Sequence, residues 1–162
     1  MTANERPAFA IRSAASPADI GAVGALFRDY AASLPMALDY QNFEAELAGL
    51  PGKYAPPDGE LLLGFGGSGN PIGCVALRRL DPERAEMKRL FVRPEGRGSG
   101  LGRALAERII AAARSRGYRE MLLDTLPSLT SALALYESLG FRRVAPYYDT
   151  PVDGTIFMGV AL

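Results

Sequence analysis

Hydrophobic positions along the chain follow two periodicities, which predicts a mixed structure of helices and strands. Apolar residues recur every three to four positions after Ser16-Pro17 and again from Leu101 to Arg116, the spacing of an amphipathic helix. Short runs dense in strand-forming residues lie between and after these stretches. We expect strands at 9–12, 60–65, 72–80, 86–92, 118–125, from 141 onward and at 155–162, and helices at 17–34, 39–50, 101–116 and 128–139.

Capping and turn-forming residues mark the expected ends of these helices and strands. Ser16, Pro17 and Asp19 form a typical helix start, and Gly117 and Gly140 stand where two helices are expected to end. A stiff, exposed loop is expected at 51–59, a hairpin turn at 66–71, and a loop rich in tyrosine and proline at 146–153. The resulting order, β-α-α-β-β-β-α-β-α-β-β, is an antiparallel meander followed by a βαβ crossover, in a single domain that spans residues 1–162.

Composition narrows the class of protein and of chemistry. The 162 residues carry 18 basic and 18 acidic side chains, so no overall field attracts nucleic acid or an anionic membrane. Cys74 is the only cysteine and there is no histidine, which excludes an intramolecular disulfide, multi-thiolate or histidine-ligated metals, and Ser/His or Cys/His nucleophile pairs. We therefore expect no metal. The polar N-terminus lacks a signal-peptide core and no apolar run reaches membrane-spanning length, so a cytoplasmic protein is expected.

The most informative stretch is a glycine-rich turn, Arg97-Gly98-Ser99-Gly100-Leu101-Gly102, between a predicted strand and a predicted helix. Backbone amides can approach a ligand closely at such glycines, and the unpaired amides of a helix N-terminus favour an anion. The surrounding window, residues 84–103, holds six basic residues and two acidic ones. A phosphate-bearing ligand is therefore expected here; the structural alternative is a turn that only packs a helix tightly on a sheet.

Two common phosphate-binding patterns do not fit this turn. The Walker pattern needs a Lys-Ser/Thr pair after its last glycine, but Gly102 is followed by Arg103-Ala104. The dinucleotide fingerprint G-x-G-x-x-G fails in both registers, because Leu101 and Arg103 stand where its last glycine is required. The turn also lies mid-chain after a hairpin, not at the first turn of a βαβ repeat. Both nucleotide-binding classes are therefore excluded.

The turn and a second stretch together resemble the GCN5-related N-acetyltransferases, the GNAT superfamily. Arg97-x-x-Gly100-x-Gly102 matches the Q/R-x-x-G-x-G/A pattern of that superfamily. A second motif follows at its proper distance: Ala132-x-x-Leu135-Tyr136-Glu137-x-Leu139-Gly140-Phe141. The order of elements is similar too. The resemblance implies an α+β, three-layer fold with a mixed, mostly antiparallel, splayed sheet of about seven strands flanked by four helices, and acetyl-CoA as the co-substrate.

For cofactor binding, the resemblance implies two sets of backbone groups. In this family the pyrophosphate lies on the amides of the turn, which here are those of Arg97, Gly98, Ser99, Gly100, Leu101 and Gly102, with Arg103 just inside the helix. Arg97 and Arg103 would also reach the 3′-phosphate or else stay solvated. The pantetheine arm of the cofactor pairs with the backbone of the preceding strand, here Leu90, Phe91 and Val92.

Tyr136 and Glu86 are the candidate catalytic residues. In this family the tyrosine of the second motif often protonates the departing thiolate or positions the thioester, so Tyr136 would also contact the cofactor; otherwise it is an aromatic residue on an apolar helix face. The acceptor amine must lose a proton before it attacks. With no histidine, Glu86 is the leading base, directly or through water, unless it is only a strand-surface carboxylate paired with Lys88 or Arg78. Asp124 is the second choice.

The acceptor is the least predictable part. We expect direct transfer of an acetyl group to a primary amine of a small molecule, such as an amino acid or polyamine, bound between the first two helices and residues 147–151. Many family members carry an asparagine near the start of the helix with the tyrosine, where this chain has Ser128 and Thr130. Two alternatives stay open: a non-catalytic acyl-CoA-binding or regulatory module, and a protein N-acetyltransferase. Edge strands near the C-terminus allow a homodimer.

Overall fold

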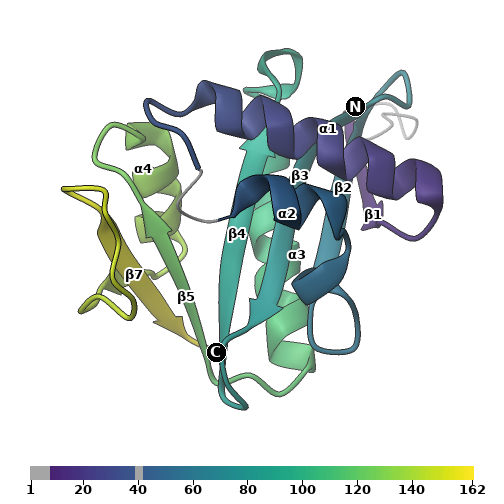
Figure 1. Cartoon of the computed structure of the whole chain (residues 1–162). Coiled ribbons are helices and arrows are strands. Elements are labelled where there is room, and N and C mark those ends of the chain that lie inside the picture. Colours follow the sequence, from purple (N-terminus) through teal and green to yellow (C-terminus); the bar gives the residue numbers. More distant parts are fainter. Residues whose placement is uncertain (1–7, 39–41) are drawn as a thin grey trace, which may run out of the picture.

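A seven-stranded sheet lies between two layers of helices in the computed structural model, which describes residues 8–38 and 42–162 (Figure 1). The strands are β1 (Phe9–Ser13), β2 (Glu60–Gly66), β3 (Pro71–Arg79), β4 (Arg84–Val92), β5 (Glu120–Thr125), β6 (Arg142–Arg143) and β7 (Ile156–Ala161). Their order across the sheet is β1-β2-β3-β4-β5-β7-β6. Every neighbouring pair is antiparallel except β4 with β5, so the expected mostly antiparallel sheet is confirmed.

The helices divide between the two faces of the sheet. They are α1 (Pro17–Ser33), α2 (Phe43–Ala48), α3 (Leu101–Ser115) and α4 (Thr130–Ser138), with short 3-10 turns η2 (Gly52–Tyr54) and η3 (Pro94–Gly96). Val23, Phe27 and Tyr54 belong to the core under α1 and α2, and Leu105 and Tyr136 to the core under α3 and α4. The chain therefore has two apolar cores, one on each face of the sheet.

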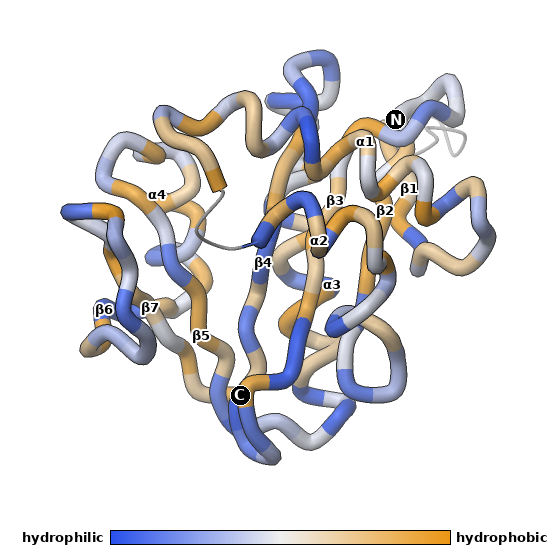
Figure 2. Tube along the Cα trace, in the orientation of Figure 1, coloured by the Kyte–Doolittle hydropathy of each residue, from blue (hydrophilic) through white to orange (hydrophobic). Residues whose placement is uncertain are grey.

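The sheet splits between its two parallel strands. β4 and β5 are paired at only three positions, Arg84 with Glu120, Ala85 with Met121 and Glu86 with Leu122. Beyond Glu86 the two strands diverge like the arms of a V (Figure 1). Figure 2 shows hydrophilic residues along β4, between more apolar stretches of β3 and β5. The expected splay is present, and it places polar groups at its edge.

A β-bulge bends β4 along this split. Ala76 of β3 lies opposite Lys88 and Cys74 lies opposite Phe91, so β4 carries one residue more than β3 over this interval. Arg89, within the bulge, has a φ of 61°, a left-handed conformation that is uncommon for any residue but glycine. The buried side chain of Arg89 points to the face covered by α2. The bulge therefore aims a charged group into the interior beside the split.

Several expected boundaries of helices and strands were wrong, as was the exposure expected of one loop. α2 begins at Phe43 rather than at 39, and its expected first residues, 39–41, lie outside the described part of the chain. The segment 51–59 is not exposed throughout, because the ring of Tyr54 fills the core between α1 and the sheet, against Phe27. β5 begins at Glu120 rather than at 118, and β6 has only two residues.

The capping interactions expected at Ser16 and Asp19 are confirmed, and Gly117 and Gly140 have the positive φ of helix ends. None of the described helices combines the length and the apolar character needed to cross a membrane.

Candidate active site

The split between β4 and β5 contains a small cavity of about 70 Å³. Its walls come from β4, β5, α4 and the segment that follows α1; the lining residues include Tyr30, Met36, Met87, Lys88, Leu90, Leu123, Asp124 and Tyr136. Pockets that enclose a whole small molecule measure roughly 300–1,000 Å³. This cavity is therefore large enough only for the end of a ligand.

Tyr136 reaches this cavity from α4. The ring is almost fully buried and packs edge-on against Phe141, with 5.8 Å between the ring centroids. Burial raises the pKa of the Tyr136 hydroxyl above its ordinary value, and the charge of Asp124 acts in the same direction. The hydroxyl therefore keeps its proton at neutral pH, and Tyr136 is one of the residues that line the cavity.

One edge of β4 is open beside the cavity. Leu90, Phe91 and Val92 come after the last residue of β4 that pairs with β5, so within residues 8–38 and 42–162 no strand pairs with them on that side. On the other side Phe91 and Val92 pair with Cys74 and Gly73 of β3. The carbonyl of Val92 accepts a hydrogen bond from the Arg97 Nε at 3.1 Å. An extended ligand can therefore add to β4 along this edge, as a further strand would.

Glycine stands at different positions of the turn for different structural reasons. Gly98 and Gly100 have φ values of 80° and 88°, a conformation that L side chains rarely adopt, and open space surrounds both. Gly96 is closely packed, because a Cβ there would lie 2.7 Å from the Ile72 Cδ1 atom. A Cβ on Gly102 would only touch Val92, at 3.8 Å. Gly98 and Gly100 thus shape a turn whose surface is open to a ligand.

The start of α3 offers donors to a ligand. Its N-cap residue, Gly100, has no side chain with which to cap it, and among the described residues the first amide of the helix that donates to the backbone is that of Ala104, to the Gly100 carbonyl at 3.0 Å. The Ser99 hydroxyl donates to the Gly96 carbonyl, which fixes the turn. Arg103 reaches across to the Ser138 hydroxyl of α4 at 2.5 Å. The backbone amides at the start of α3, before that of Ala104, suit an anion of the size of a phosphate.

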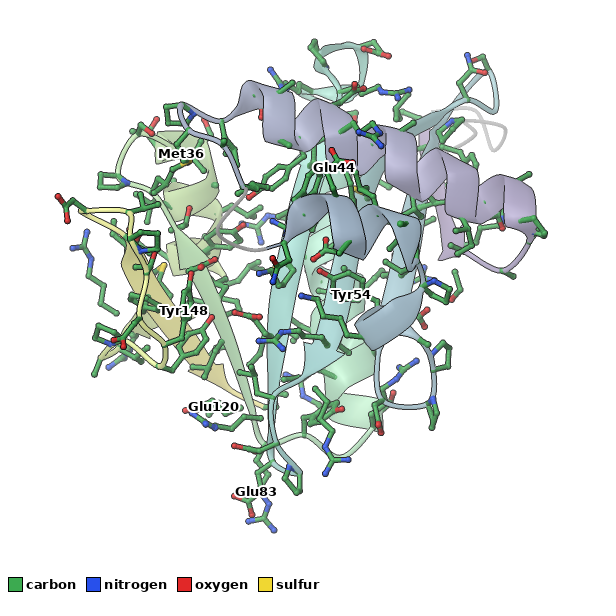
Figure 3. The ribbon with its side chains drawn as sticks, viewed as in Figure 1. Met36, Glu44, Tyr54, Glu83, Glu120 and Tyr148 are labelled. Carbon is green, nitrogen blue, oxygen red and sulfur yellow. The ribbon has the colours of Figure 1, made fainter. Side chains whose placement is uncertain are left out.

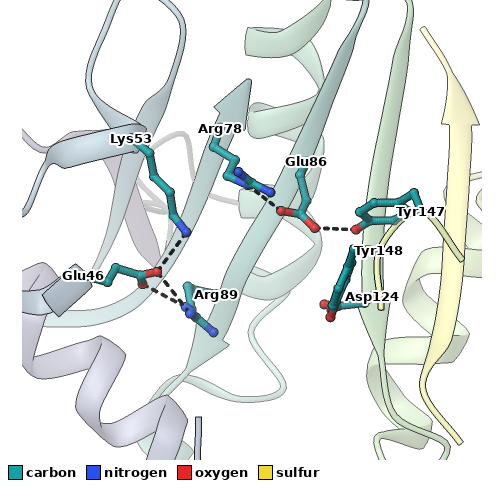
Figure 4. A network of polar contacts seen from close by, with 8 residues as sticks. All are labelled: Glu46, Lys53, Arg78, Glu86, Arg89, Asp124, Tyr147 and Tyr148. Carbon is teal, nitrogen blue, oxygen red and sulfur yellow. Dashed lines mark hydrogen bonds and ion pairs between the residues drawn. The ribbon is translucent and has the colours of Figure 1, made fainter. Parts of the chain in front are cut away.

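Glu86 lies where the split begins and is 1% exposed. It accepts a hydrogen bond from the Arg78 Nε at 2.7 Å and another from the Tyr147 hydroxyl (Figure 4). Burial opposes ionisation of Glu86, but Lys88, the Tyr147 hydroxyl and Arg78 together outweigh it, so the pKa of Glu86 lies below its ordinary value. The pairing with Arg78 is thus present, but Glu86 is not a surface carboxylate.

A second carboxylate, Asp124, faces the split from β5. It accepts a hydrogen bond from the Tyr148 hydroxyl, next to the tyrosine that binds Glu86 (Figure 4). The rings of Tyr147 and Tyr148 pack on Phe157 of β7, with 5.2 Å between centroids in both pairs. Figure 3 shows Tyr148 in front of β5, while Met36 lies close to α4. Of the expected walls, the segment around Tyr30 and Met36 lines the cavity, whereas 147–151 reaches its edge only through the bond of Tyr148 to Asp124.

An ion-paired cluster on α2 and η2 escaped sequence reasoning. Arg89 donates to both carboxylate oxygens of Glu46, at 3.1 and 3.2 Å, and the Lys53 Nζ lies 3.2 Å from the same group (Figure 4). The Arg89 guanidinium also lies 5.3 Å from the centre of the Phe43 ring. Arg89 and Glu46 are 43 positions apart, and nothing in the local sequence links them. The unusual run of charged residues within β4 is the feature of the sequence that could have indicated this cluster.

Two other expectations concern polar groups. Ser128 and Thr130 are exposed and line no part of the cavity, where Leu129 and Ala132 lie instead. Among residues 8–38 and 42–162, no three His, Cys, Asp or Glu side chains gather closely enough to hold a metal ion.

Comparison with known proteins gives a consistent result. The model of the acetyltransferase (GNAT) family matches residues 25–141. An uncharacterised N-acetyltransferase of Schizosaccharomyces pombe is 41% identical over 88% of this chain and 88% of its own length. The N-acetylaspartate synthetase of Danio rerio is 34% identical over 67% of this chain and 39% of its own length. The crystal structure of an acetyltransferase from Streptococcus agalactiae has a TM-score of 0.79 at 22% identity, covering 97% of this chain and 100% of its own, which is a likeness of fold.

Proposed function

This chain belongs to the acetyltransferase (GNAT) family and is an acetyl-CoA-dependent acyltransferase, and on that premise we propose that it acetylates a primary amine of a small molecule by direct attack. The observation that carries the proposal is the split in the sheet. It joins a cavity beside Tyr136 to an open strand edge and to an uncapped helix N-terminus. Release of free CoA thiol from acetyl-CoA across a panel of amines tests it, and the absence of release with every amine would contradict it.

The residues present fit acetyl-CoA, which supplies an acetyl group already activated as a thioester. We assign the pyrophosphate to the amides of residues 97–102, because these include the donors that α3 leaves uncapped. Arg103 stands within the same helix start. The pantetheine arm would pair with the open edge of β4 at Leu90, Phe91 and Val92. The cavity then receives the acetyl end, beside Tyr136.

In this proposal Tyr136 acts on the departing sulfur. Its raised pKa keeps the proton on the hydroxyl, so the group donates a hydrogen bond to the thiolate as negative charge develops there. The surroundings are almost dry, which strengthens such a bond. Attack by the amine and departure of the thiolate need no covalent enzyme intermediate. The buried Cys74, whose Sγ donates to the Arg89 carbonyl, stays outside the chemistry.

Glu86 removes the proton of the attacking amine in this proposal, through water. A base is most effective when its pKa is close to the working pH, whereas the pKa of Glu86 is lower than usual. The carboxylate is ionised throughout the neutral range and only relays the proton. Its contribution is therefore expected at the lower end of general-base catalysis, at about 10²-fold.

Glu86→Gln should consequently lower the rate more at low pH than at high pH. At pH 7 an alkylamine is almost wholly protonated, and without a base only its small neutral fraction reacts. We expect a loss of about 10²-fold at pH 7 that shrinks towards pH 10, where the amine loses its proton unaided. The measurement is kcat/KM against pH for one amine.

Glu60→Gln is the matched control for this profile. Glu60 is partly buried rather than fully buried, but like Glu86 it is bonded to an arginine, with 3.0 Å between its Oε2 atom and Arg116 Nη2, and it stands at the start of β2, away from the split. Its profile should coincide with that of the unaltered protein. A loss in Glu86→Gln that stays constant with pH would contradict the assignment of the base.

Support for a small acceptor comes from one relative. The name of the Danio rerio protein states that it makes N-acetylaspartate, an acetylated amino acid. Acetylation of a protein amine is the alternative, and the same panel, extended with peptides, decides between them. A single domain over 1–162 and a homodimer through the sheet edge stay predictions.

A further inference from the structure

We propose that Asp124 binds the acceptor: its carboxylate accepts a hydrogen bond from the protonated amine in the cavity and directs the nitrogen towards the acetyl group. The proposal rests on the proposed function and adds to it a residue that contacts the substrate. It gives the two carboxylates at the split different roles, because Asp124 holds the amine whereas Glu86 takes the proton through water. Two observations carry it: the position of Asp124 in the split, and the contacts of Glu86.

Asp124 stands where the two parallel strands part. The pairing of β4 with β5 ends at Glu86 and Leu122, and Asp124 is the next residue of β5 whose side chain is on the same face as that of Leu122. Among residues 8–38 and 42–162, Asp124 is the carboxylate that lines the cavity, and it is partly exposed. A ligand in the cavity can therefore touch this carboxylate directly.

Asp124 and Tyr136 reach the cavity from opposite faces of the sheet. Met121 and Leu123 alternate with Asp124 along β5, and both belong with Tyr136 to the core under α3 and α4. The side chain of Asp124 therefore points to the other face of the sheet. An amine held by Asp124 thus approaches the acetyl group without displacing Tyr136, to which the departing sulfur is assigned.

The contacts of Glu86 suit a different role. One of its oxygens accepts a hydrogen bond from Arg78 and the other from Tyr147. The side chain is buried and is not part of the cavity wall. An amine inside the cavity therefore meets Asp124 first, and its proton travels to Glu86 through water.

The carboxylate of Asp124 is held in place for such a contact. Its Oδ2 atom accepts a hydrogen bond from the Tyr148 hydroxyl (Figure 4). The ring of Tyr148 packs against those of Tyr147 and Phe157, with 5.5 and 5.2 Å between centroids. A carboxylate accepts about four hydrogen bonds, and the bond from Tyr148 uses one of these places. Tyr148 therefore orients Asp124 without occupying it.

The cavity also contains cations, which make a carboxylate important for binding an ammonium group. Lys88 and Arg89 both line it, and Arg89 is paired with Glu46. The charge of Asp124 favours the charged form of Lys88, so these two groups act on each other. An incoming ammonium group meets Lys88 as a like charge and Asp124 as an opposite one. Loss of the Asp124 charge would remove the attraction and leave the repulsion.

Binding of an amine without turnover tests this proposal. The protein is saturated with CoA in place of acetyl-CoA, and calorimetry measures the dissociation constant of the amine. The probe is whichever of propylamine, cadaverine, alanine and lysine has the highest kcat/KM with acetyl-CoA. In Asp124→Asn we expect that constant to rise at least tenfold, the scale of a hydrogen bond to a charged group. Asp124→Glu keeps the charge and should recover part of the loss.

Two controls separate the position of a carboxylate from its charge. Glu86→Gln removes the other carboxylate at the split, so kcat/KM should fall while the dissociation constant of the amine stays within about twofold. Asp58→Asn removes an exposed carboxylate just before β2, away from the split, and should change neither quantity.

Tyr148→Phe gives a second measurement that leaves the carboxylate itself in place. Without the tyrosine hydroxyl Asp124 is less well oriented, so the dissociation constant of the amine should rise about threefold while that of CoA stays unchanged. An amine that binds equally well to the unaltered protein and to Asp124→Asn would overturn the proposal, as would unchanged binding in Tyr148→Phe or a larger loss in Glu86→Gln. The proposed function would survive each of these results, since it fails only if no amine releases CoA from acetyl-CoA.

Discussion

Glutamate in place of Gly100 should weaken the binding of acetyl-CoA by about 10³-fold. Gly100 stands at the N-terminus of α3, in the open turn to which we assign the pyrophosphate. Two like unit charges 4 Å apart repel each other by about 4 kcal/mol at an effective dielectric constant of 20. This energy corresponds to a dissociation constant that is roughly 10³-fold higher. A carboxylate at residue 100 would exert this repulsion on the phosphates. Isothermal titration calorimetry with acetyl-CoA measures the change directly.

Gly117→Glu is a close control for that substitution. Gly117 stands at the other end of the same helix, with a φ of 87° against 88° at Gly100, and both positions have open space around them. The strain of a side chain in the left-handed region, about 1 kcal/mol, is therefore common to both variants. Gly117→Glu should bind acetyl-CoA normally. Unchanged binding in Gly100→Glu as well would mean that the turn is not the phosphate site.

Removal of the Tyr136 hydroxyl should lower kcat by between about 10² and 10³-fold, the usual effect of deleting one donor to a developing negative charge. The ring of Tyr136 packs on Phe141, so phenylalanine keeps the shape of the cavity wall. The dissociation constant of acetyl-CoA should change little, because the hydroxyl acts mainly on the departing thiolate. Single-turnover kinetics on Tyr136→Phe, together with calorimetry, separate the two quantities.

Tyr118→Phe provides the comparison for Tyr136→Phe. Tyr118 is also a buried tyrosine, and its hydroxyl donates to the Asp58 carbonyl at 2.8 Å, away from the split. This variant should lose some stability and keep its kcat. If Tyr136→Phe keeps its kcat too, Tyr136 is a packing residue and the thiolate leaves without its help.

The parts of the site that sequence could predict are those built from neighbouring residues. The turn around Gly100 and the helix that follows it depend on local spacing, and both are present at the expected positions. Tyr136 was proposed from a motif on one helix, and it lies on that helix, α4, beside the cavity. The hairpin of β2 and β3 depended on a short turn. In each case a few consecutive residues determine the conformation.

The remaining features depend on contacts between distant segments. Tyr147 and Glu86 are 61 positions apart, and the bulge at Arg89 is stabilised by Glu46 on a helix of only six residues. The helix predicted from 39 begins at Phe43, behind a left-handed Asn42. Periodicity does not register such pairings, because each partner alone is an ordinary charged or aromatic residue. The side of the split to which we assign the acceptor is made almost entirely of these contacts.

The split sheet also bears on how this protein opens and closes in solution. β1 to β4 form one half of the sheet and β5 to β7 the other, and in the described part of the chain three residue pairs make up the strand pairing between them. Local opening should therefore occur first along this seam, and amide hydrogen exchange should be fastest there among the buried strands. A cofactor added along β4 would act as a removable strand between the halves. At a concentration 100 times its dissociation constant it would raise the free energy of opening at the seam by about 2.7 kcal/mol and so slow exchange there.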